Sequence, residues 1–139
     1  MKALLYLDSS AALRVLFNEA GARIPLDGSA EIVTSRLTAV EVARAIERAR
    51  LAGALDDRLT VQAQSAAQDL LSRCHLLNID EEVFRLAAMP FGVAVRSLDA
   101  LHVASAQRVA LRLGRPITVW THDERMRDAA MARSLFFAG

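Results

Sequence analysis

The chain has 139 residues, a mass of 15.1 kDa and a formal net charge of +1 at neutral pH. With 53% hydrophobic residues, a chain of this length can bury about two-thirds of its unfolded surface, so we expect one domain spanning residues 1–139. Cys74 is the only cysteine, which excludes an intrachain disulfide. The near-neutral charge excludes the strongly basic class of nucleic-acid-binding domain. Charge alone therefore predicts no particular partner.

The N-terminal segment is short and is interrupted early by an acidic residue. Lys2 is followed by five uncharged residues before Asp8, which is too few for the apolar core of a signal peptide or for a membrane span. We therefore expect a cytoplasmic protein without a membrane partner.

Short apolar runs alternate with longer stretches of helical periodicity. Gly21, Gly53 and Gly114 mark helix ends, and Pro90 ends a further helix. This pattern predicts strands at 2–7, 31–35, 75–79 and 117–120, and helices at 9–20, 37–51, 56–71, 81–89, 97–113 and 123–133.

Alternating strands and helices with buried strands are typical of an α/β domain in which helices flank a parallel sheet. We predict a three-layer α/β fold with a mostly parallel sheet of four to five strands. The fifth strand is left open, because the final LFFAG (135–139) lacks β-branched residues and follows no clear turn.

Four acidic residues lie at or inside hydrophobic segments. A carboxylate removed from water is costly unless hydrogen bonds, a partner charge or a metal ion stabilises it. In a parallel sheet, loops that follow the strands meet beyond the carboxyl ends of the strands, and ligands bind there. We expect these acids to lie near that edge and to form one site. They are Asp8, Glu41, Asp99 and Asp123.

Each acid also has a structural explanation at a helix N-terminus. Asp8 stands directly before a helix, and Asp99 follows Ser97 at the start of another. Asp99 nevertheless leads an apolar stripe along its helix, which directs its carboxylate towards the sheet. Taken singly the acids favour capping, whereas together they favour one shared site. The capping boxes to be weighed are Thr38 with Glu41, and Thr121 with Glu124, which leaves Asp123 beside a helix N-terminus.

The type of ligand indicates the type of metal. Clustered carboxylates repel one another unless protons or a cation neutralise them, and oxygen ligands favour Mg²⁺ or Mn²⁺ over zinc. The histidines, His75, His102 and His122, lack the spacing of a zinc motif, and His102 is interpreted as a packing residue or a support for the acids. Phosphate-cradling and nucleophile-elbow motifs are absent from the sequence.

Four segments carry a resemblance to a known family: YLDSSAAL, LTAVEVARA, RSLDALHVASA and THDERM, in this order along nearly the whole chain. The chain resembles PIN-domain ribonucleases, specifically the VapC-type toxins of bacterial toxin–antitoxin pairs. The resemblance implies a five-stranded parallel sheet, endoribonuclease activity, a homodimer and a cognate antitoxin. It also implies that Asp8, Glu41, Asp99 and Asp123 form the catalytic metal site, with Ser9 and Thr121 as supporting hydrogen-bond donors.

The function predicted from these observations is hydrolysis of RNA phosphodiester bonds, with Mg²⁺ or Mn²⁺ as cofactor. Whether Glu41 and Asp123 bind the metal or position water is left open. Arg44 and Arg48 lie one and two turns after Glu41 and are weighed as phosphate contacts against a simple solvated helix face.

The alternative is a non-catalytic PIN-like module that binds RNA or a protein through the same acids. In VapC-type toxins the antitoxin is expected to lie along an apolar groove of the early helices. The candidates for that groove are Leu13, Leu16, Phe17, Leu59 and Val61.

Overall fold

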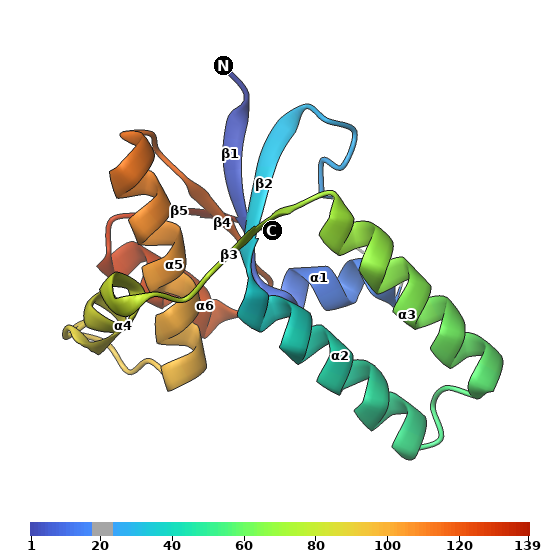
Figure 1. Cartoon of the computed structure of the whole chain (residues 1–139). Helices are drawn as coiled ribbons and strands as arrows, with labels where there is room; N and C mark the ends of the chain where they lie inside the picture. Colours follow the sequence, from blue (N-terminus) through green and yellow to red (C-terminus); the bar gives the residue numbers. More distant parts are fainter. Residues whose placement is uncertain (18–23) are drawn as a thin grey trace.

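The protein is described by a computed structural model that covers residues 1–17 and 24–139. Within these ranges five parallel strands form one sheet in the order β3-β2-β1-β4-β5, and helices cover both of its faces (Figure 1). The three-layer α/β fold is thereby confirmed. In chain order the elements are β1 (Ala3–Leu7), α1 (Ser9–Leu16), β2 (Ala30–Ser35), α2 (Arg36–Leu51), α3 (Asp57–Ser72), β3 (His75–Leu77), α4 (Glu81–Ala88), α5 (Ser97–Leu113), β4 (Thr118–Trp120), α6 (Glu124–Ala132) and β5 (Phe136–Ala138).

The two faces of the sheet have separate cores because successive residues of a strand point to opposite sides. Leu4 and Tyr6 of β1 pack with apolar residues of α5 and α6, whereas Leu7 packs with residues of α1, α2 and α3. A smaller cluster joins α4 to α5. In Figure 1, α2 and α3 form a hairpin on one side of the sheet, and α4, α5 and α6 lie on the other.

The strand order creates a switch point at the middle of the sheet. The chain passes from β1 outward through β2 to β3, then returns to place β4 on the other side of β1. The helices that follow β1 and β4 leave towards opposite faces, α1 to one core and α6 to the other. Loops that diverge in this way leave a crevice at the carboxyl ends of the strands, where ligands bind in sheets of this type.

The C-terminal segment does form a fifth strand. Phe136 to Ala138 pair in parallel with Thr118 to Trp120 of β4. The chain reverses through Ser134, which has a positive φ of 58° that turn-forming sequences usually assign to glycine or asparagine. Because a serine adopts this turn conformation, the sequence before the strand contains no conventional turn signal.

Most predicted boundaries lie within two residues of the observed ones. The first helix differs more, since α1 ends at Leu16 and Phe17 is no longer helical. The remainder of its predicted length, up to Gly21, lies outside the described residues. None of the helices in the described ranges is both long and apolar enough to span a bilayer.

Candidate active site

Asp8 lies at the switch point and is almost fully buried. It follows β1 directly, its backbone N–H donates to the carbonyl of Trp120 at the end of β4, and its side chain is 3% exposed. The hydroxyls of Ser10 and Thr121 both donate to Oδ2, at 2.6 and 2.8 Å. Oδ1 has no hydrogen-bond donor among the described residues, which leaves it available to a cation.

The capping explanation that was weighed against a site role for Asp8 is wrong. Asp8 occupies the N-cap position of α1, yet its carboxylate makes no cap hydrogen bond. The carboxylate instead accepts from hydroxyls of two separate elements, α1 and the segment after β4. A buried acid held in this way is positioned for something other than the helix N-terminus.

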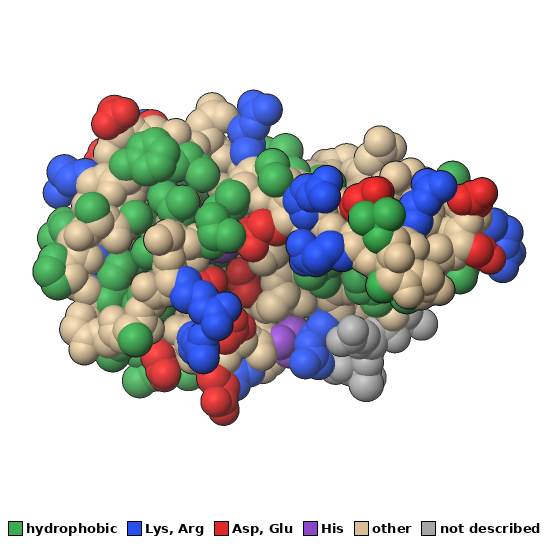
Figure 2. Space-filling view, turned by 90° about the horizontal axis from the view of Figure 1, so that it is seen from below, with side chains coloured by type: hydrophobic (Ala, Val, Ile, Leu, Met, Phe, Trp, Pro, Cys, Tyr) green, Lys and Arg blue, Asp and Glu red, His purple; other side chains and the backbone are tan. Residues whose placement is uncertain are grey.

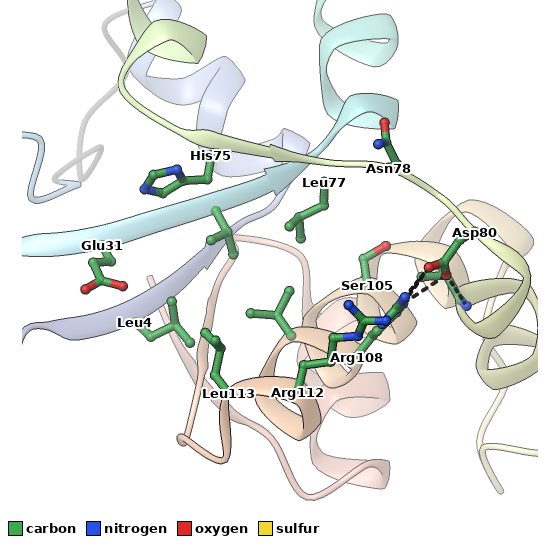
Figure 3. A pocket seen from close by; sticks show the side chains of 13 residues that line it. Leu4, Glu31, His75, Leu77, Asn78, Asp80, Ser105, Arg108, Arg112 and Leu113 are labelled. Atoms are coloured by element: carbon green, nitrogen blue, oxygen red, sulfur yellow. Dashed lines mark hydrogen bonds and ion pairs between the residues drawn. The ribbon is translucent and has the colours of Figure 1, made fainter.

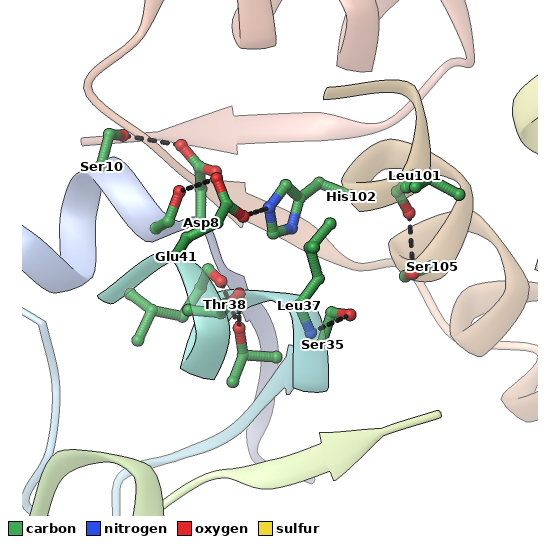
Figure 4. Close-up of polar contacts among 12 residues, drawn as sticks. Asp8, Ser10, Ser35, Leu37, Thr38, Glu41, Leu101, His102 and Ser105 are labelled. Carbon is green, nitrogen blue, oxygen red and sulfur yellow. Dashed lines mark hydrogen bonds and ion pairs between the residues drawn. The ribbon is translucent and has the colours of Figure 1, made fainter. Parts of the chain in front are cut away.

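Glu41 extends from α2 towards the same edge. Ser9 Oγ donates to Oε2 at 3.2 Å, and Nε2 of His102 forms a short hydrogen bond with Oε1. Figure 4 shows Asp8 and Glu41 lying next to each other, with His102 of α5 reaching Glu41 from the other side. Three elements that are far apart in the sequence therefore converge on Glu41.

The predicted capping box of Thr38 and Glu41 is also wrong. Helix α2 begins before Thr38, and Ser35 caps it by accepting from the backbone N–H of Leu37 at 3.0 Å. Thr38 is fully buried within the helix, and the carboxylate of Glu41 contacts Ser9 and His102 rather than a backbone N–H. The capping explanation for Glu41 is thereby removed.

Among the four candidate acids, Asp123 is the one whose side chain caps a helix. Its Oδ1 accepts from the backbone N–H of Arg125 at 2.9 Å, and its own backbone N–H donates to Thr121 Oγ1 at 3.1 Å. The predicted capping box of Thr121 and Glu124 is therefore wrong, because Thr121 directs its hydroxyl to Asp8. Thr121 joins the two acids that flank the switch point.

Asp99 lies half-buried in the first turn of α5. Burial raises the pKa of its carboxyl group, as do the negative charges of Asp123 and Asp8, while His102 and Arg96 oppose the shift. The predicted Ser97 cap is not observed, since Arg96 holds the N-cap position without a side-chain cap bond. Asp99 accepts no hydrogen bond from any described residue, so its charge is compensated less than that of its neighbours.

His102 and Tyr6 extend the network into the core. Burial lowers the pKa of His102, but the Glu41 hydrogen bond and the charges of Asp8, Glu41 and Asp99 outweigh burial and raise it overall. Burial also raises the pKa of Tyr6, with the Asp8 charge adding to the effect, so the phenol keeps its proton at neutral pH. Sequence reasoning identified His102 as a packing or supporting residue but missed Tyr6, which reads as an ordinary strand aromatic.

The donor set fits a hard divalent cation. Carboxylate and hydroxyl oxygens surround the switch point, and Lys and Arg form no ion pair with Asp8, Glu41, Asp99 or Asp123 within residues 1–17 and 24–139. No three His, Cys, Asp or Glu side chains in those ranges are arranged as the ligands of one ion. The acids are thus neighbours whose charges repel one another, with the oxygen chemistry that Mg²⁺ or Mn²⁺ prefers.

Basic side chains lie beside the acids on the molecular surface. Figure 2 shows acidic side chains near the middle of the face that it presents, with Lys or Arg side chains on both sides. Arg44 and Arg48 are exposed on α2, and neither forms an ion pair with a described residue. Arg50, on the same helix, is instead paired with Asp57 at 2.9 Å. Arg44 and Arg48 are therefore free to contact phosphates.

The predicted apolar groove exists in part. A hollow of about 320 Å³ lies between α1 and α3, and Leu16, Phe17 and Leu59 line it. Leu13 packs against the adjoining core, whereas Val61 is 63% exposed and does not line the hollow. Three of the five predicted residues therefore line the groove, and Leu13 and Val61 do not.

A second hollow, of about 390 Å³, lies at the other side of the sheet beside edge strand β3 (Figure 3). Sequence reasoning missed it. Its polar rim contains Arg108 of α5, which donates to Asp80 at 2.9 Å through Nε. Glu31 at the same rim pairs with Arg115 at 3.1 Å. The sequence feature that could have indicated this polar rim is the spacing of Arg108 and Arg112, which lie one helical turn apart on α5.

Comparison with known proteins places the chain among nucleases. The model of the PIN domain family matches residues 5–131. Ribonuclease VapC46 of Mycobacterium tuberculosis is 36% identical over 128 residues, which cover 92% of this chain and 91% of the relative. Ribonuclease VapC35 of the same species is 33% identical over 138 residues, with 95% and 93% coverage.

Solved structures share the fold at low sequence identity. FitAcB from Neisseria gonorrhoeae superposes with a TM-score of 0.69 at 17% identity and covers 97% of this chain and 96% of its own. DNA-bound VapBC from Salmonella typhimurium also gives a TM-score of 0.69, at 15% identity, with 99% and 98% coverage. These likenesses show a common fold.

Proposed function

The chain belongs to the PIN domain family, and on that premise we propose that it is a divalent-metal-dependent endoribonuclease that acts as the toxin of a toxin–antitoxin pair. One observation carries the proposal. Asp8 is buried at the switch point, two hydroxyls hold its Oδ2, its charge helps to raise the pKa of Asp99, and Glu41 lies beside it (Figure 4). Such a carboxylate requires a cation.

The proposed ion is Mg²⁺, with Mn²⁺ as its substitute in the same oxygen site. Asp8, Asp99 and Asp123 would hold it, together with Glu41. When bound, a divalent cation supplies charge neutralisation and Lewis-acid polarisation of a phosphodiester. Ser10 and Thr121 fix the orientation of Asp8 through its Oδ2.

Substrate binding is assigned to the arginines beside the acids. Arg44 and Arg48 are exposed on the helix that carries Glu41, one and two turns further on. Planar guanidinium groups bind phosphate oxygens in a bidentate manner, and such contacts position a nucleic acid without reading its sequence. An RNA strand held there passes beside the four acids.

The test is cleavage by protein from which metal has been removed. The protein is incubated with tRNAs, rRNA fragments and mRNA, with and without Mg²⁺ or Mn²⁺, beside Asp8→Asn. We expect cleavage by the wild-type protein only with metal, and loss of it in the variant. Undiminished cleavage by rigorously purified Asp8→Asn would sink the proposal. Absence of Mg²⁺ and Mn²⁺ binding together with tight partner binding would favour a non-catalytic module.

The antitoxin is assigned to the groove between α1 and α3. Leu16, Phe17 and Leu59 leave a hollow of about 320 Å³ that can receive apolar side chains of a partner helix. Several solved neighbours are toxin–antitoxin complexes, including VapBC2 from Rickettsia felis. The occupant proposed for the groove is an amphipathic segment of the cognate antitoxin.

A matched pair of variants tests this groove. Leu59→Asp places a charge inside the hollow and should prevent co-purification with the co-expressed antitoxin. Val61→Asp lies two residues further on α3 but outside the hollow, so it should leave the complex intact. Equal behaviour of the two variants would contradict the assignment.

Homodimerisation is proposed for the unit formed by α4 and α5. Phe84, Val93 and Leu98 on or between these helices are each about half exposed, at 50%, 46% and 48%. Exposed apolar groups on neighbouring elements can form an interaction surface. Light scattering should give the mass of a dimer for the wild-type protein and of a monomer for Phe84→Asp, and a monomeric wild-type protein would refute the proposal.

A further inference from the structure

We propose that His102 is a positioning residue that fixes the carboxylate of Glu41, and that Tyr6 in turn fixes His102. The inference rests on the proposed function, since Glu41 matters here as a member of the metal site. It assigns a task to two buried side chains that do not themselves face the substrate.

His102 occupies a position where an apolar residue would be expected. It is 1% exposed, and its neighbours along α5 include Val103, Ala104 and Ala106, all fully buried. A buried imidazole is destabilising unless both ring nitrogens have partners. Both do: Nδ1 lies 2.7 Å from the hydroxyl of Tyr6, and Nε2 forms the short hydrogen bond with Glu41.

The direction of the bond to Glu41 follows from elementary hydrogen-bond chemistry. An ionised carboxylate can only accept, so Nε2 must carry the hydrogen. The phenol of Tyr6 can donate to Nδ1 of a neutral ring or accept from a charged one. In either case Nε2–H points at Oε1 of Glu41, and the conclusion does not depend on the charge of His102.

Both oxygens of Glu41 are therefore held from opposite sides. His102 donates to Oε1, and Ser9 donates to Oε2 at 3.2 Å. Ser9 is adjacent to Asp8, so the plane of the Glu41 carboxylate is set relative to the buried acid. A glutamate has three side-chain torsions and, if unsupported, would leave its oxygens disordered over several orientations.

The hydrogen bonds from Tyr6 to His102 and from His102 to Glu41 join three elements. Tyr6 comes from the central strand β1, His102 from α5 and Glu41 from α2. Tyr6 is fully buried and its ring meets the imidazole edge to face, with 5.8 Å between centroids. The rigid centre of the sheet thus determines where a flexible carboxylate lies. Partners of this kind, behind metal ligands, typically contribute about 10- to 100-fold to metal affinity or activity.

A merely structural histidine would explain the same burial, so the test must separate the two roles. His102→Leu removes the donor and keeps an apolar side chain, while His102→Gln retains an N–H near the position of Nε2. Each is combined with Glu41→Ala, which removes the acceptor, in a double-mutant cycle. Mn²⁺ affinity is measured by calorimetry without RNA, and kcat and KM for RNA cleavage are measured separately.

We expect His102→Leu to weaken Mn²⁺ binding by about 10- to 100-fold and to lower kcat with little change in KM. His102→Gln should recover most of the loss. Once Glu41 has been replaced, His102→Leu should have no further effect. Additive effects in the double variant, or wild-type Mn²⁺ affinity in His102→Leu, would overturn the inference while leaving the proposed function intact.

A wild-type protein that binds no Mn²⁺ would overturn the proposed function and this inference together. A third readout needs neither metal nor RNA. Nitrogen NMR of the metal-free protein should show a hydrogen on Nε2 of His102. Tyr6→Phe removes the partner of Nδ1 and should therefore weaken the preference of the ring for a hydrogen on Nε2. A ring protonated only at Nδ1 would contradict the proposed direction of support.

Discussion

Two regions of the molecule treat their acidic residues in opposite ways. At the rim of the hollow beside β3, Asp80 is paired with Arg108, and Glu31 with Arg115. At the carboxyl edge of the sheet, four acids lie near one another, and in the described residues their hydrogen-bond donors are hydroxyls, one imidazole and one backbone N–H. Arginine is abundant in this chain, yet no arginine in the described residues forms an ion pair with any of those four.

The difference separates acids with an arginine partner from the four acids that we propose as functional. A guanidinium partner satisfies a carboxylate permanently and lowers its pKa, as Arg108 does for Asp80. Burial and neighbouring acids raise the pKa of Asp99 instead, so the folded protein carries uncompensated charge at that edge. Repulsion of this type destabilises the metal-free protein and favours cation binding.

The largest effect should follow from Asp99→Asn. Removing one of the acids should lower metal-dependent RNA cleavage by about 10²- to 10³-fold, since the charge that binds the cation is lost. The midpoint of thermal unfolding in the presence of a chelator should remain equal or rise, because a repelled carboxylate has been removed. Retained cleavage in the purified variant would erase the distinction between the two regions.

A smaller effect should follow from the arginines that lack acidic partners. Arg44→Gln and Arg48→Gln should each raise KM for RNA by a few fold, leave kcat nearly unchanged, and reduce the salt dependence of binding by about one phosphate contact. Arg50→Gln is the matched control, because Arg50 lies on the same helix but is already paired with Asp57. An equal loss in the control would indicate a general charge effect.

Asp80→Asn should alter stability and not activity. Asparagine keeps the cap at the start of α4, where Asp80 accepts from the backbone N–H of Val83 at 3.1 Å, but loses the ion pair with Arg108. The thermal midpoint should fall by a few degrees with RNA cleavage unchanged. A variant that cleaves poorly would show that the hollow and the acidic edge are coupled.

The smallest effect concerns pH. Because the folded-state pKa of Asp80 lies below its unfolded value, the ion pair contributes fully above about pH 4 and is lost as pH falls through the folded pKa. The urea midpoint of the wild-type protein should therefore fall more steeply below about pH 4 than that of Asp80→Asn. Parallel curves would show that Arg108 does not stabilise the ionised form.

The elements of the fold and the edge of the sheet where the candidate acids lie could be predicted from the sequence, whereas the contacts of several side chains could not. Apolar periodicity located every observed helix, and the carboxyl edge followed from alternating strands and helices. The T-x-x-E pattern at Thr38 misled because Ser35, three residues earlier, had already begun the helix. A capping pattern depends on where a helix starts, and local sequence defines that point poorly.

The hydrogen-bond partners of the acids could not be predicted from local sequence patterns either. Thr121 and Asp8 are 113 residues apart, and Tyr6 and His102 are 96 apart, so only the folded topology brings them together. The fifth strand was in doubt because Ser134 adopts a turn conformation without the residues that usually signal one. The resemblance to VapC-type toxins supplied the acids as a set, and the structure supplied their supports.

The central position of β1 also determines when the acidic edge can assemble during synthesis of the chain. Asp8 is synthesised well before its donor Thr121, which follows it by 113 residues, and before its neighbour Asp123. β4, which pairs beside β1 and brings both of them, is translated late. A growing chain therefore cannot assemble the site before β4 and the segment that follows it have been made. A fragment that stops before Thr118 lacks half of the crevice.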